Sequence, residues 1–193
     1  LLEKGPVVTP GEIEILKNEL CKQIENSSGG ALVVFSGGIP EGMDDNIYYE
    51  LICKANSKGA VCFLDSSSKP LIQGMDADLV FAKPNIREFG QIAEHLSKEQ
   101  NLQMFHGVNS DNIFEIKNLK KIIEISKELK TENLVITLSG KGALLISGNK
   151  IFHMIAPEIE PVNTIGSGDS FTAGFAFAYA NGMSISYCLK LAG

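Results

Sequence analysis

The sequence lacks the features that mark several large classes of protein. It has no basic stripe, and its net charge is -6, so a surface for nucleic acid is not expected. We expect no secretory leader, and no apolar run approaches the roughly 18 residues of a membrane span. We therefore expect neither a nucleic-acid partner nor a membrane partner.

The cysteines form no pair of the CxxC type and lie at no spacing that suits a metal site. All four are found in apolar surroundings, which is typical of small core residues with free thiols. Free thiols favour a reducing, cytoplasmic location. The cysteines are Cys21, Cys53, Cys62 and Cys188.

Two common nucleotide-binding motifs are also missing. No GxGxxG follows the first predicted strand with an acidic residue about 20 positions further on, which argues against a dinucleotide-binding oxidoreductase. No GxxxxGK(S/T) is present, which argues against a P-loop kinase. A nucleotide would have to be bound by other elements.

What is present is an alternation of predicted strands and helices over a single domain, residues 1–193. A capping box, Thr9 with Glu12, starts the first helix. The order favours a mostly parallel α/β sheet with helices on both faces, and ligands bind at the carboxyl ends of the strands in such sheets. Strands are predicted at 31–35, 60–64, 79–82 and 134–138, a hairpin at 143–146 and 151–154, and helices at 45–57, 86–96, 112–129, 166–180 and from 184 onward. The first strand is expected to be buried because it is a continuous apolar run.

The turn Gly166-Ser167-Gly168 leads directly into an apolar helix and carries the strongest chemical signal. Free backbone amides at the start of a helix bind anions, and the helix dipole adds to the attraction. Asp169 then places a carboxylate beside this anion pocket, where it can accept a proton from an attacking hydroxyl. The alternative is a glycine-rich turn in which Asp169 is an ordinary residue of the first helical turn.

The segment Lys83-Pro84-Asn85 follows a strand, and Glu88 comes three residues after Asn85. One interpretation is a helix cap in which Asn85 and Glu88 satisfy each other's backbone amides. The other is a Mg²⁺ site that Asn85 and Glu88 form through water beside phosphate groups. Lys83 either neutralises phosphate charge or is a solvated lysine in a loop.

The segment from Asn163 to Phe175 resembles the second signature of the ribokinase-like carbohydrate kinases, the group that contains ribokinase, 1-phosphofructokinase and tagatose-6-phosphate kinase. Asn163, Thr164, Gly166, Ser167, Gly168, Asp169, Phe171 and Gly174 all fit it. The resemblance implies a ribokinase-like fold. It also implies an anion hole at Gly166, Ser167 and Gly168, with Asp169 as the catalytic base.

Three further loops resemble this family. Thr137 and Gly142 match a nucleotide-binding loop, in which Ser139 stands where the family usually has Gly; the alternative is a plain turn from a strand into a hairpin. The resemblance implies ATP contacts at Thr137, Ser139, Gly140 and Gly142, and at Lys83 and Asn85. Ser36, Gly37 and Gly38 match a loop that lies near the phosphorylated sugar, with Gly38 in place of Ser. Asp65-Ser66-Ser67 matches a motif that follows a strand, although a capped strand end is an equal alternative.

The resemblance runs from Gly5 to the end of the chain and implies an ATP- and Mg²⁺-dependent kinase of a ketohexose phosphate. Fructose 1-phosphate is the first choice of substrate and tagatose 6-phosphate the second. We expect the family's N-terminal part and its lid, through which a homodimer could form, to be absent, because both ends of the chain look cut. The piece alone is then expected to fold poorly. A non-catalytic sensor on the same fold, or a kinase of another small sugar, are the alternatives.

Overall fold

The structure, a computed structural model, describes residues 5–100, 105, 107–160 and 163–193, so the abrupt start at Leu1 lies outside the described residues. One six-stranded sheet forms its centre, with the strands in chain order. The first four are parallel, and the last two form an antiparallel hairpin. The strands are β1 (Leu32–Ser36), β2 (Val61–Asp65), β3 (Leu79–Ala82), β4 (Thr131–Thr137), β5 (Ala143–Ser147) and β6 (Lys150–Met154).

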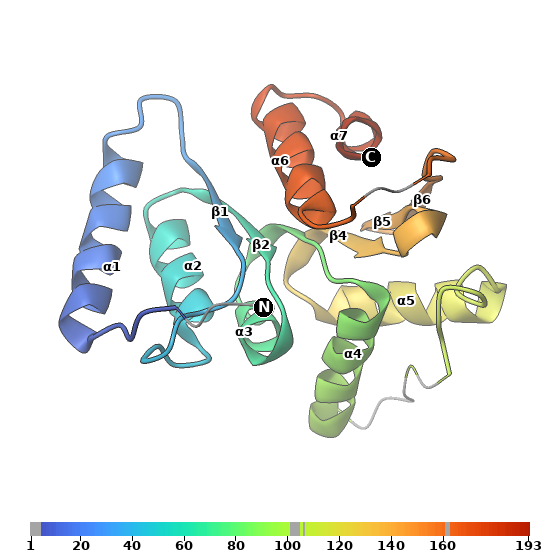
Figure 1. The fold of residues 1–193 in the computed structure, drawn as a ribbon, viewed down its shortest axis with the longest axis horizontal. Helices are drawn as coiled ribbons and strands as arrows, with labels where there is room; N and C mark the ends of the chain where they lie inside the picture. The colour runs from blue at the N-terminus through green and yellow to red at the C-terminus, as the bar shows by residue number, and fades with distance from the viewer. Residues whose placement is uncertain (1–4, 101–104, 106, 161–162) are drawn as a thin grey trace.

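Helices cover both faces of this sheet, as the sequence predicted. Side chains alternate along β2, so Cys62 and Leu64 join one apolar core while Phe63 joins another. The first core packs against α1 to α5 and the second against α6 and α7, which Figure 1 shows on opposite sides of the strands. The helices are α1 (Pro10–Glu25), α2 (Ile47–Ser57), α3 (Ser68–Gly74), α4 (Ile86–Gln100), α5 (Ile116–Glu128), α6 (Ser167–Ala180) and α7 (Ile185–Ala192), with a 3₁₀ turn η1 (Ser139–Lys141).

Local signals in the sequence placed several elements well. The predicted capping box starts α1: the Thr9 amide donates to Glu12 Oε2 at 2.8 Å, and the Glu12 amide donates to Thr9 Oγ1 at 3.4 Å. The hairpin of β5 and β6 turns at Gly148, whose φ of 58° suits glycine. Ser184 precedes α7, where a helix start was expected.

Other expectations were wrong. β1 is an edge strand rather than a buried one, and Val34 is 41% exposed, because β1 pairs only with β2 among the described strands. The helix α3 was not predicted. α5 begins four residues later than expected, because Asn109 Oδ1 accepts the amides of Asp111 and Asn112 in a turn. Cys53 is exposed rather than part of the core.

Within the described part of the chain, no helix combines the length and the apolar character that crossing a membrane requires.

Candidate active site

The loops after the four parallel strands meet at one edge of the sheet, as their common direction requires. Backbone hydrogen bonds connect them in sequence. The Gly37 amide after β1 donates to the carbonyl of Asp65 at the end of β2 (2.9 Å). The Thr137 amide at the end of β4 donates to the carbonyl of Pro84 after β3 (3.0 Å). Loops that are up to 100 residues apart in the sequence therefore form one continuous edge.

Gly166 is the residue that caps the amino end of α6, and it has a left-handed conformation with φ 80° and ψ 0°. The predicted anion hole is narrower than expected, because the Ser167 amide already donates to the Thr164 carbonyl at 3.2 Å. The amides of Gly168 and Asp169 donate to no residue that the structure describes. These two amides, rather than that of Ser167, are the ones available to an anion.

Asp169 lies in the first turn of α6, and its side chain is exposed. Among the described residues, none forms a hydrogen bond or an ion pair with its carboxylate. The Asp169 carboxylate therefore has no partner among the described residues, and it lies in the same helical turn as the two open amides. Its oxygens are therefore available to accept a proton from a hydroxyl bound within hydrogen-bond reach.

Next to the start of α6 lies a cluster of Asp65, Lys83 and Thr172, in which Lys83 and Thr172 are buried and Asp65 is partly buried. Asp65 Oδ1 is 3.0 Å from Lys83 Nζ, and Asp65 Oδ2 accepts the Thr172 hydroxyl at 2.6 Å. Lys83 is only 7% exposed, so its interpretation as a solvated loop lysine is wrong. A methyl group added to Gly168 would lie 3.2 Å from Lys83 Nζ. The Lys83 ammonium group therefore lies against the first turn of α6.

Asn85 and Glu88 form the predicted helix cap at the start of α4. The Asn85 amide donates to Glu88 Oε2 (2.8 Å), and Asn85 Oδ1 accepts the amides of Glu88 and Arg87 (2.9 Å each). No group of three acidic, histidine or cysteine residues in the described part could hold a metal by itself. Glu88 Oε1 takes no part in the cap, which fits the way Mg²⁺ binds through one or two carboxylates, water and substrate phosphates.

The predicted nucleotide loop contains η1 and ends at Gly142. Thr137 forms a parallel bridge with Asn85, so this loop and the start of α4 lie side by side. Ser139 has a φ of 55°, so it keeps a left-handed conformation that glycine adopts more easily. Gly142 has a φ of 89°, and any side chain there would collide with the backbone of Met154.

The predicted sugar loop, Ser36-Gly37-Gly38, is held by two hydroxyl groups, one from Ser66 of the Asp65-Ser66-Ser67 motif and one from Tyr48, which the sequence analysis did not identify. The carbonyl of Gly37 accepts the Tyr48 phenol at 3.1 Å and the Ser66 hydroxyl at 2.8 Å. Burial, and to a lesser degree the nearby Asp65 carboxylate, raises the pKa of Tyr48, so the phenol stays protonated and donates. Tyr48 lies inside a helix pattern and carried no signal of its own in the sequence.

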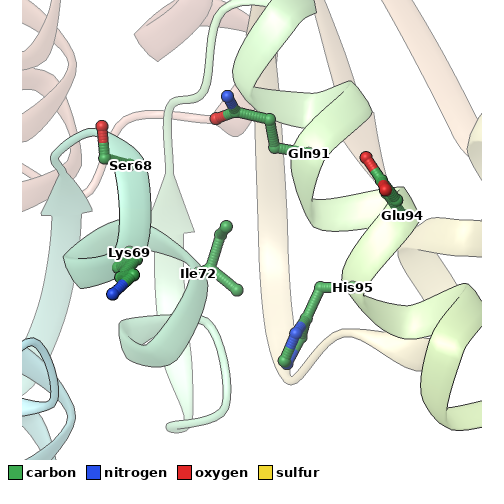
Figure 2. Close-up of a pocket in the computed structure, with 6 residues that line it drawn as sticks. All are labelled: Ser68, Lys69, Ile72, Gln91, Glu94 and His95. Carbon is green, nitrogen blue, oxygen red and sulfur yellow. The ribbon is translucent and has the colours of Figure 1, made fainter.

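A pocket of about 290 Å³ lies between α3 and α4. Figure 2 shows the side chains that line it, which are Ser68, Lys69, Ile72, Gln91, Glu94 and His95. None of the predicted site residues lines it. It therefore belongs to a different part of the surface from the edge described above.

Comparison with known proteins gives matches over nearly the whole chain. The sequence profile of the pfkB family of carbohydrate kinases matches residues 7–193. A 1-phosphofructokinase from Borreliella burgdorferi is 30% identical over 192 residues, which are 96% of this chain and 54% of the relative. A tagatose-6-phosphate kinase from Staphylococcus epidermidis is 29% identical over 91% of this chain and 52% of the relative. The chain spans about half the length of these curated relatives.

Solved structures confirm the predicted fold. Phosphofructokinase-2 from Escherichia coli, in complex with potassium, matches with a TM-score of 0.78 and 22% identity, over 100% of this chain and 56% of that one. Ribokinase from Arabidopsis thaliana, in complex with ribose and ATP, matches with a TM-score of 0.58 and 20% identity, over 98% of this chain and 52% of that one.

Proposed function

Because the chain belongs to the pfkB family of carbohydrate kinases, we propose that it carries the nucleotide-binding and catalytic residues of a sugar-phosphate kinase. The reaction transfers the γ-phosphoryl group of ATP to a primary hydroxyl of a ketohexose phosphate. The observation that carries this proposal is the exposed, uncommitted carboxylate of Asp169 beside the two open amides of α6.

In this proposal Asp169 accepts the proton of the sugar hydroxyl as that oxygen attacks the γ-phosphorus. Such a base typically contributes about 10²- to 10⁴-fold to the rate. The Gly168 and Asp169 amides, together with the dipole of α6, stabilise the negative charge on the transferring group. Attack forms the new oxygen–phosphorus bond, ADP leaves with the electrons of the old one, and the proton stays on Asp169 until product release.

ATP is assigned to the edge formed by Asn85 and by the loop that follows β4. Thr137, Ser139, Gly140 and Gly142 are the residues of this loop that we expect to contact the nucleotide, and their closeness to Asn85 supports one continuous site. Mg²⁺ would be held by the ATP phosphates, with Glu88 and Asn85 reaching it through water, and it would neutralise phosphate charge.

Fructose 1-phosphate is the proposed acceptor, with tagatose 6-phosphate as the second candidate. The names of the two relatives support both candidates. The Ser36-Gly37-Gly38 loop is proposed as a contact for the sugar phosphate. Two observations support this contact: the loop lies at the same edge of the sheet, and hydrogen bonds from Tyr48 and Ser66 hold it in place.

The proposal is tested by measuring ATP consumption by the complete protein that contains these residues, with Mg²⁺ and with each of fructose 1-phosphate, tagatose 6-phosphate and fructose 6-phosphate. Its Asp169→Asn variant, purified in the same way, controls for contaminating kinases. We expect turnover with one of the first two sugars. No turnover with any of them would overturn the proposal and would favour a non-catalytic sensor or a kinase with another acceptor.

A further inference from the structure

The cluster of Asp65, Lys83 and Thr172 connects three elements at one point. Asp65 is the last residue of β2, Lys83 directly follows β3, and Thr172 lies in the second turn of α6. Each oxygen of the Asp65 carboxylate has its own partner, Lys83 Nζ at 3.0 Å and the Thr172 hydroxyl at 2.6 Å. The side chains of Lys83 and Asp65 are 8% and 13% exposed, so both partners are held in a largely dry environment.

A buried ion pair is weak evidence for stability. Removing two charges from water costs about as much free energy as their attraction returns, and well-packed apolar residues often do as well or better. Lys83 is also the one charged residue among the buried side chains of the described part of the chain. Fold stability is thus a poor reason for a lysine at this position, and its neighbours suggest a better one.

The Lys83 ammonium lies against the start of α6. A methyl group at Gly168 would be only 3.2 Å from Lys83 Nζ, so glycine is what allows this approach. Thr172 is four residues after Gly168 and therefore lies on the same face of the helix. Its hydrogen bond to Asp65 joins this face of α6 to the end of β2, close to the turn that carries Asp169 and the open amides.

We propose that Asp65 and Thr172 are positioning residues, which hold the Lys83 ammonium against Gly168 so that its positive charge, partly offset by the Asp65 carboxylate, lies beside the anion pocket of α6. This inference rests on the proposed function and deepens it. The charge acts on the phosphoryl group as negative charge accumulates in the transition state. Asp65 acts through Lys83 and does not touch the substrate.

The first test measures kcat and KM in the complete protein for Lys83→Met and Asp65→Asn, which remove one charge each and keep the approximate shape. We expect kcat to fall about 10²-fold in Lys83→Met and about 10-fold or more in Asp65→Asn, with smaller changes in KM for the sugar. If Asp65 acts through Lys83, the double variant is no slower than Lys83→Met alone. Losses that multiply in the double variant, or an unchanged kcat in Asp65→Asn, would overturn the proposal.

Thr172 provides a conservative pair of variants. Thr172→Val removes the hydroxyl at constant shape and should lower kcat about tenfold, whereas Thr172→Ser should restore most of it. Asn118→Ala serves as the matched control for lost stability, because Asn118 is also buried and hydrogen-bonded but lies on α5. We expect this control to lower the melting temperature without lowering kcat. An equal loss of kcat in the control would reduce the cluster to a structural role.

A failure of the proposed function can be separated from a failure of this inference. If the parent protein phosphorylates no sugar phosphate, the same variants are compared by calorimetric titration with ATP and Mg²⁺ alone. The inference then predicts that Lys83→Met and Asp65→Asn both weaken ATP binding about tenfold, and that Asn118→Ala does not. Unchanged ATP affinity in the first two variants would overturn it.

Discussion

Two glycine turns border the proposed site, and they differ in what surrounds them. Gly142 and Gly166 have nearly the same φ, 89° and 80°. A methyl group at Gly142 would collide with the backbone of Met154, whereas at Gly166 it would meet no atom of the described residues within 4 Å. Glycine at position 142 is required by packing. At position 166 glycine allows the left-handed conformation of the turn and leaves open space beside it, which a phosphate group can occupy.

The largest expected effect is on the packed turn. Gly142→Ala should reduce the free energy of unfolding by about 4 kcal/mol or more, because the new methyl group forces apart the turn and the end of β6 at an unfavourable φ. Chemical denaturation of the complete protein measures this loss. Gly140→Ala is the matched control for stability, since a methyl group at this neighbouring glycine meets nothing within 4 Å. Equal stability of the two variants would contradict the claim that packing requires glycine at position 142.

At the open turn we expect a smaller loss of stability and a clear loss of activity. Gly166→Ala should cost about 1–2 kcal/mol, the usual penalty of a left-handed conformation for a residue with a side chain. Gly148→Ala has the same penalty without a clash, at the far end of the sheet. Both variants should therefore melt at similar temperatures, but only Gly166→Ala should lower turnover, by about tenfold. If Gly148→Ala lost as much turnover, the space at Gly166 would have no special role.

Gly168→Ala distinguishes crowding from strain, because Gly168 has an ordinary helical conformation. Alanine should stabilise the helix by up to about 1 kcal/mol, but its methyl group displaces Lys83. We expect nearly unchanged stability and about tenfold lower kcat. Thermal melting and steady-state kinetics on the same sample test both parts, and full activity would show that Lys83 does not act at this position.

The smallest effect concerns Ser139, a residue with a side chain in a left-handed conformation, at φ 55°. Ser139→Gly should stabilise the protein by up to about 1 kcal/mol, because glycine adopts this φ without strain. Denaturant titration of parent and variant measures the difference. A loss of stability would mean that the Ser139 side chain contributes contacts that outweigh its backbone strain.

Elements that depend on a few neighbouring residues were predicted correctly from the sequence. The capping box of Thr9 and Glu12 and the hairpin at Gly148 depend on a few neighbouring residues, and both are confirmed. The start of α5 was missed because the side chain of Asn109 holds the preceding residues in a turn. The exposure of Val34 was missed because an apolar run does not tell a central strand from an edge strand.

The sequence was enough to predict which loops form the proposed site, but not which side chains contact one another in it. Directions of parallel strands sufficed to bring Ser36, Lys83 and Thr137 to one edge, whereas Asp169 reaches it through the start of α6, which lies against Lys83. The pairing of Asp65 with Lys83 and Thr172 was not predictable, because Thr172 is 107 residues from Asp65 and carries no motif. An aspartate at the very end of a buried strand was the one signal that could have suggested a buried partner.

The central claim is that Asp169 is the base of a phosphoryl transfer at the start of α6. Its most direct test compares kcat, ATP affinity and melting temperature of Asp169→Asn with those of the parent and of Ser170→Ala, a matched change at the next residue of the same turn. We predict that Asp169→Asn lowers kcat about 10²- to 10⁴-fold with little change in ATP affinity or melting temperature, while Ser170→Ala stays close to the parent. An Asp169→Asn variant as active as the parent would contradict the account.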